Sequence, residues 1–143
     1  GTTASIESIF VLDEGVLRCQ GRAVHQTGGI EETIRQPIAQ NVATFQVRYL
    51  LQSNSAANPT MPTMQYTDAA GVGRNWNRVQ GVEVCLVLFG TERIDMPTDD
   101  PDLTSYTDCT NTKVDMTTLT GDRTNRMHYV FRNVFQLRSQ GLI

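Results

Sequence analysis

The sequence predicts a mainly β fold with antiparallel sheets, and three observations support this fold class. The chain has 143 residues, 39% of them hydrophobic, which is enough for a single domain (residues 1–143) with an ordinary core. Short segments are rich in Phe, Tyr, Val and Thr, residue types that favour strands. Eleven Gly and five Pro, with frequent Asn and Asp, provide the turns between these segments.

The first predicted elements are a hairpin and a short helix. An apolar run over residues 8–12, a turn-like Asp-Glu-Gly and a second apolar run over residues 16–19 predict a β-hairpin. Residues 22–26 are a weaker strand candidate. A short helix is expected over residues 31–35, before a proline interrupts the polar stretch.

Longer elements follow in the rest of the chain. Residues 44–52 alternate apolar and polar side chains and predict a strand with one packed face, whereas residues 53–64 predict a polar loop. Residues 79–89 are apolar at both sets of alternate positions, which predicts a central strand buried on both faces. Residues 90–125 carry few apolar side chains and predict a long surface excursion. Helical spacing also fits residues 127–137, but their aromatic and β-branched residues favour a strand.

Charge and histidine content argue against two classes of function. A net charge of -3 lacks the basic excess of a nucleic-acid binder, so no nucleic-acid contact is expected. The two histidines, His25 and His128, lie beside neither a cysteine nor a G-x-S-x-G motif, so we predict no catalytic residue, no enzymatic activity and no cofactor. His128 falls on the polar side of the last predicted strand, where a solvated ring is expected.

Two further features have alternative interpretations. Five aspartates of the predicted excursion offer the oxygen ligands that Ca²⁺ prefers: Asp95, Asp99, Asp100, Asp102 and Asp108. Their spacing differs from that of an EF-hand loop, which favours solvated carboxylates over a Ca²⁺ site. Trp76, between two asparagines, is either a plug at the end of the 79–89 strand, a partner contact or a sugar-binding platform.

Four segments, in order, carry a family resemblance. The first contains Leu-Arg-Cys-Gln-Gly within residues 15–21, and the second is the alternating stretch over residues 37–49. The third runs from Trp76 to Leu86. The last combines Tyr-Thr-Asp-Cys at residues 106–109 with the arginine-containing stretch over residues 126–137. Together they resemble the PilW family of minor pilins of type IV pili; the J-type pseudopilin of type II secretion is a related alternative.

This resemblance implies a fold, a function and a location. The fold would be the α+β globular domain of a pilin, preceded in the family by a leader and a long apolar helix that would lie ahead of Gly1 and anchor the protein in the membrane. The function would be non-catalytic: assembly with other minor pilins and the major pilin to initiate the pilus and cap its tip, where a tip adhesin is a further expected partner. The location would be the inner membrane and periplasm before assembly and the extracellular pilus afterwards. An adhesin-like tip module that binds a surface ligand is the alternative function.

Cysteines and arginines complete the predictions. An oxidising compartment, and an excursion with few apolar anchors, predict a disulfide between Cys85 and Cys109. In the family the cysteine matching Cys19 pairs further upstream, which would leave Cys19 unpaired here. On the last strand, three arginines share one face and are either a solvated cover or a patch for an acidic partner: Arg126, Arg132 and Arg138.

Overall fold

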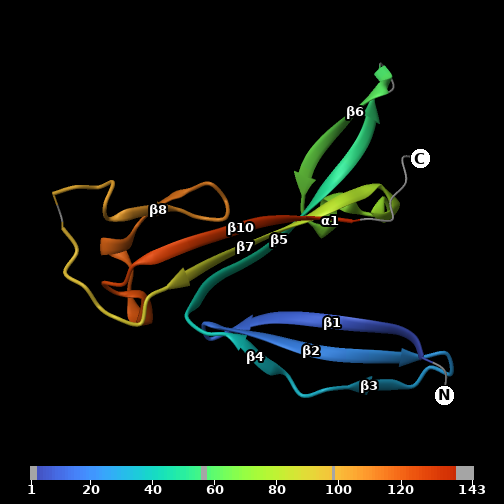
Figure 1. Cartoon of the computed structure of the whole chain (residues 1–143), viewed down its shortest axis with the longest axis horizontal. Helices are drawn as coiled ribbons and strands as arrows, with labels where there is room; N and C mark the ends of the chain where they lie inside the picture. Colours follow the sequence, from blue (N-terminus) through green and yellow to red (C-terminus); the bar gives the residue numbers. More distant parts are fainter. Residues whose placement is uncertain (1–2, 56–57, 98, 138–143) are drawn as a thin grey trace.

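The computed structural model describes residues 3–55, 58–97 and 99–137, and it confirms a mainly β fold with antiparallel sheets (Figure 1). Sheet A contains β1 (Thr3–Asp13), β2 (Val16–His25), β3 (Ile30–Glu32) and β4 (Gln36–Ala39). Sheet B has the order β10-β7-β5-β6, built from β5 (Val42–Ser55), β6 (Asn58–Thr67), β7 (Val79–Phe89) and β10 (His128–Gln136). A small third sheet pairs β8 (Ser105–Thr107) with β9 (Lys113–Asp115).

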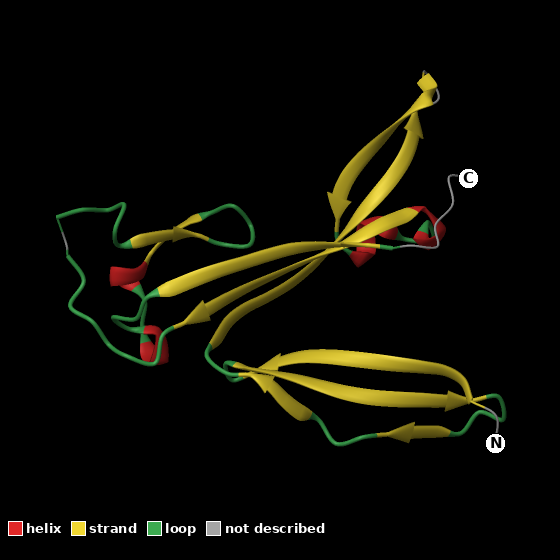
Figure 2. Ribbon diagram, in the orientation of Figure 1, coloured by secondary structure: helices red, strands yellow, loops and turns green. Residues whose placement is uncertain are grey.

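The helical elements are short and lie near the two ends of the long strands of sheet B (Figure 2). Two of them, α1 (Ala69–Val72) and η1 (Trp76–Arg78), connect β6 to β7. The other two, η2 (Met116–Thr118) and η3 (Gly121–Arg123), precede β10. The middle of sheet B is therefore left to the strands themselves.

Sheet A confirms the predicted hairpin and corrects the predicted helix. Strands β1 and β2 are joined by Glu14 and Gly15, both with positive φ (47° and 75°), as a two-residue hairpin turn requires. Residues 22–25 belong to the same strand β2. The expected helix over residues 31–35 is wrong, because β3 pairs with β2 through Val24 and Ile30, and so few residues cannot form a stable helix against that competing edge.

Strand β5 confirms the strand predicted over residues 44–52, but the loop predicted over residues 53–64 is wrong. Strand β5 continues to Ser55, and β6 returns beside it from Asn58. Hydroxyl groups replace apolar contacts here, since Ser53 Oγ lies 2.7 Å from Thr63 Oγ1 across the pair. Backbone pairing thus forms an exposed hairpin from a segment too polar to be recognised as one.

Strand β7 is central, as predicted, but it is not buried on both faces. Side chains at odd positions from Val79 to Val87 are buried, whereas those at even positions from Val82 to Leu88 are only half-buried. The described residues between β7 and β10, 90–97 and 99–127, are here called the excursion. They pack over one side of the sheet, where Met116 and Cys109 are each 1% exposed. We call this side the covered face and the opposite side the open face.

The last strand confirms the strand interpretation of residues 127–137. Strand β10 pairs with β7 from His128 opposite Phe89 to Gln136 opposite Gly81, without a shift in register. Side chains directly opposite each other in an antiparallel pair share a face. This register therefore places the aromatic residues of β10 on the open face and its arginine on the covered face.

Candidate partner-docking surface

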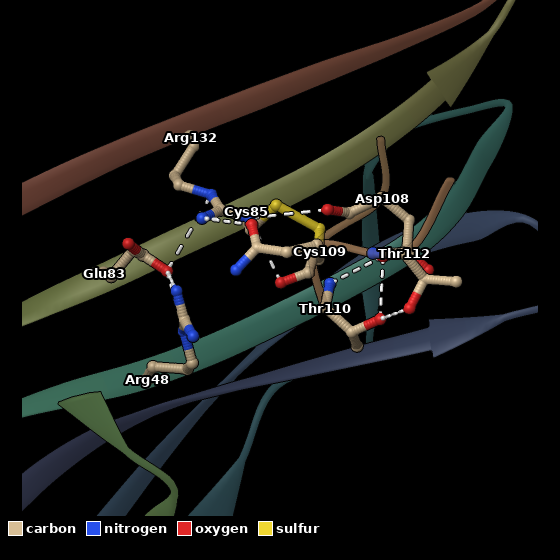
Figure 3. Close-up of a disulfide and its surroundings, with 9 residues drawn as sticks. Arg48, Glu83, Cys85, Asp108, Cys109, Thr110, Thr112 and Arg132 are labelled. Carbon is tan, nitrogen blue, oxygen red and sulfur yellow. Dashed lines mark hydrogen bonds and ion pairs between the residues drawn. A yellow bond between two sulfur atoms is a disulfide. The ribbon is translucent and has the colours of Figure 1, made fainter. Parts of the chain in front are cut away.

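The covered face is held by a disulfide between β7 and the excursion (Figure 3). Cys85 and Cys109 are bonded, as predicted, with their Cα atoms 5.8 Å apart. Val87, Tyr106 and Val130 pack around the bond. The excursion is thereby attached to the middle of sheet B, and Cys19, half-buried on β2, is unpaired.

Next to the disulfide, a buried carboxylate lies between two arginines (Figure 3). Glu83 is 3% exposed and accepts hydrogen bonds from Arg48 Nη2 at 2.7 Å and Arg48 Nε at 2.9 Å. Arg132 Nε lies 4.0 Å from the same carboxylate oxygen. This cluster was not predicted from the sequence. The available signal was a glutamate within the most apolar segment, together with an arginine on the polar side of the strand predicted over residues 44–52.

The open face is apolar across three strands. Strand β7 contributes Val84 and Leu86 at its centre, and β5 places Val47 and Phe45 opposite them. On β10 the aromatic residues are half-exposed: Tyr129 is 54%, Phe131 is 55% and Phe135 is 54% exposed. Monomeric soluble proteins seldom leave so much contiguous apolar surface without a binding partner.

The open face has a boundary at one end and a continuation at the other. The register of β5 and β7 shifts between Leu50 and Leu51. Beyond the shift, Leu51 and Val79 form a buried cluster with Val72 of α1, and this cluster closes one end of the open face. Towards the other end, the ring of Phe10 on β1 lies 6.2 Å from the ring of Phe45. Apolar surface therefore passes from sheet B onto sheet A.

The chain matches a known family model over most of its length. The family model of type IV pilus-assembly protein W, PilW, matches residues 8–139. The chain belongs to this family. Comparison with curated proteins finds no match, and comparison with solved structures finds none either.

PilW-family membership assigns the chain to the assembly of type IV pili, a process of the cell envelope. Assembly requires surfaces that bind other subunits, and the open face has half-exposed aromatic side chains along β10. None of the helices in the described residues is long and apolar enough to span a membrane.

In this PilW-family chain the arginine just before β10 and the arginine within it contact the chain itself. Arg126 Nη1 donates to the Gly90 carbonyl at 3.0 Å, and the guanidinium lies over the Phe89 ring. Arg132 donates to the Cys109 carbonyl at 3.1 Å, in addition to its approach to Glu83. Arg138 lies outside the described residues. The partner-contact role of these arginines stays a prediction.

Trp76 is neither buried nor isolated. It is 47% exposed, and its ring and the Tyr49 ring form a T-shaped pair with 4.9 Å between centroids. Tyr49 packs against the cluster that closes one end of the open face, so Trp76 forms part of the same end. Of its neighbours, Asn75 donates from its side chain to the Val72 carbonyl at 3.3 Å, which stabilises the turn leading into η1.

The aspartates of the excursion act mainly in turns and at strand ends. Asp100 accepts from the Asp102 backbone N–H at 3.0 Å, and Asp102 itself pairs with Lys113 at 2.9 Å. Asp108 accepts from the backbone N–H groups of Thr110 and Thr112. Among the residues that the structure describes, no three carboxylate, imidazole or thiol groups are placed to hold a metal ion.

His128 is where the expectation of a solvated ring is wrong. Its residue is 4% exposed, its ring stacks on Tyr106 with 5.1 Å between centroids, and Nδ1 lies 2.8 Å from the Arg126 carbonyl. Arg123 Nε donates to Nε2 at 3.0 Å, and Arg123 Nη2 donates to the Tyr106 hydroxyl at 2.8 Å. The excursion folds over the start of β10 and buries an imidazole that the strand pattern alone assigns to solvent.

Acidification is expected to destabilise the chain through His128. Burial lowers the pKa of His128 below its usual 6.5, the hydrogen bond to the Arg126 carbonyl opposes this shift, and the positive charge of Arg123 adds to it. The unfolded chain then binds a proton on His128 at a higher pH than the folded chain does. The contribution of neutral His128 to the free energy of unfolding is therefore fully present above pH 6.5 and is lost as the pH falls through that value. Urea unfolding between about pH 7.5 and about pH 5.5 should show this loss, and H128Q should flatten it.

Proposed function

We propose that this chain is a non-catalytic minor pilin subunit that acts with other minor pilins to initiate the pilus and cap its tip. Family membership supports a structural role in pilus assembly, and the open face is the observation that supports docking. The histidine that the fold buries contacts an arginine, a tyrosine and a carbonyl, which is no arrangement for nucleophilic catalysis.

An apolar helix is the partner that best fits the open face. Neighbouring strands lie about 4.8 Å apart, so β5, β7 and β10 together span about 10 Å, close to the diameter of one helix with its side chains. The register aligns Phe45, Leu86 and Phe131 across this face, and none of the residues that it places on the same face is charged. The family resemblance implies that these proteins carry such a helix at their N-terminus. Trp76 would contact this helix at the end of the open face.

A charge introduced into the open face should block assembly. V47K places an ammonium group on β5 at the centre of the face, where a docked helix would remove its water, at a cost of about 2 kcal/mol or more and therefore over tenfold in binding. In cells whose own gene carries V47K, surface pili counted by electron microscopy should fall at least tenfold. Co-purification of the other minor pilins should fall with them.

Two matched variants show whether position or charge is responsible. L103K adds the same charge to a residue that is 61% exposed on the excursion, and it should leave piliation unchanged. V47T keeps a β-branched side chain of similar volume and should retain most of it. Normal piliation in V47K, with the altered protein present at normal abundance, would contradict the proposed use of this face.

A further inference from the structure

Strand β10 is an edge strand without two of the usual protections, a proline and a bulge. In the part of the chain that the structure describes, no strand pairs with its outer side. Its nine residues include no proline, and its pairing with β7 has no bulge. The opposite edge strand, β6, contains Pro59 and Pro62, which cannot donate a backbone hydrogen bond. Natural proteins often block edges by such means, so an edge with neither a proline nor a bulge is open to pairing with another strand.

The direction of the backbone groups of β10 follows from its hydrogen bonds. Leu137 donates its N–H to the Gln80 carbonyl, and the Met127 carbonyl accepts from the Gly90 N–H. The backbone N–H and C=O groups of odd-numbered residues therefore face β7, and those of even-numbered residues face outwards, away from the sheet. The outward N–H of Val134 is satisfied by the side-chain oxygen of Asn133 at 2.9 Å, a local contact that an incoming strand can replace.

A groove on the open face adjoins this edge. It is lined by Val84 and Leu86 of β7 and by residues 131–133 and Phe135 of β10. The groove has a volume of about 370 Å³. Because Asn133 is shorter than its two aromatic neighbours, an aromatic side chain from an added strand can lie above it.

We propose that a second copy of this chain pairs with the β10 edge, antiparallel, about a two-fold axis at Val134. Each Val134 then lies opposite its counterpart, and the outward backbone groups of Arg132 bond to those of Gln136 in the second copy. Phe135 of each copy lies opposite Asn133 of the other and enters the groove there. The strand is complementary to itself in this register, as an isologous two-fold interface requires.

Charge favours this register over the adjacent one. With the axis at Val134, the two Arg132 side chains are four residues apart along the strand direction, about 14 Å, beyond the screening length at physiological salt. An axis at Arg132 would place the two guanidinium groups directly opposite each other. The paired edge is short, so the dimer is expected to be weak and dependent on concentration.

The test measures the mass of the isolated chain by sedimentation over a range from roughly 1 μM to roughly 1 mM. All proteins carry C19S, so that the unpaired thiol cannot link two copies. The parent chain should shift from 15.9 kDa towards twice that mass as concentration rises. V134P should weaken the dimer at least tenfold, whereas V134T, which retains the N–H, should dimerise like the parent.

The proline variant is expected to fold, since the Val134 N–H is not bonded to β7, and an unchanged melting temperature would verify this. As a second readout, amide exchange at Arg132, Val134 and Gln136 should slow at high concentration. A chain that stays monomeric throughout, or a V134P chain that dimerises like the parent, overturns the proposal. V47K should not affect dimerisation, so failure of this inference is distinguishable from failure of the proposed pilin function.

Discussion

Without the bond between Cys85 and Cys109, the free energy of unfolding should fall by about 3.5 kcal/mol, the chain-entropy value for a loop closed across 24 residues. The double variant C85A/C109A removes the bond without leaving a thiol or a new polar group in a site where both residues are 1% exposed. Thermal unfolding should show a melting temperature lower by roughly 10 °C.

The unpaired cysteine supplies the control for this experiment. C19S removes a thiol that forms no bond, and it should change the melting temperature by no more than about 2 °C. Peptide mapping of the parent chain without reductant should recover Cys85 and Cys109 in one linked pair. Recovery of either residue linked to Cys19, or a double variant as stable as the parent, would show that the bond does not stabilise the fold in solution.

Removal of Arg48 should destabilise the chain by about 3 kcal/mol. R48M retains much of the packing of the side chain but leaves the carboxylate of Glu83, 3% exposed, without its two closest donors. Arg132, at 4.0 Å, replaces only part of that interaction because it also donates to the excursion. Urea denaturation at neutral pH should show the loss as a lower midpoint with an unchanged slope.

A double variant distinguishes the buried charge from lost packing. R48M/E83L replaces both members of the pair by apolar side chains, and it should recover most of the stability lost in R48M. R18M is a matched control, since Arg18 is a partly exposed arginine on β2 in sheet A, and it should cost less than about 1 kcal/mol. A double variant that is no more stable than R48M would mean that arginine packing, not the charge, is responsible.

The alternation of apolar and polar side chains predicted the strands that have one packed face and one exposed face. The hairpin around Gly15 and the strand after Thr44 have apolar side chains at alternate positions, and the local pattern is enough to identify them. Strand β6 was missed because Thr63 and its neighbours need no apolar contact to complete backbone pairing in an exposed hairpin. A pattern of side chains does not reveal a strand that is held by its backbone.

The candidate site was less predictable, because its burial depends on residues distant in sequence. His128 is buried by Tyr106 and Arg123, and Glu83 is buried beside Arg48 on another strand. Strand β7 was expected to be buried on both faces because apolar side chains occupy both sets of its alternate positions. Only the disulfide-linked excursion determines which face is covered, and sequence alone does not say that the other face is open to a partner.

The bond from Cys85 to Cys109 also limits how far the chain can be extended by force. As the pilus subunit proposed above, the chain would transmit tension along its backbone, and a partly unfolded chain lengthens by about 3.4 Å for each residue released. The 24-residue segment closed by the disulfide cannot be pulled straight, so the maximum length of the extended chain is shorter by about 80 Å. Sheet B is joined to the excursion by a covalent bond at its centre, so tension that separates β10 from β7 still leaves the excursion attached.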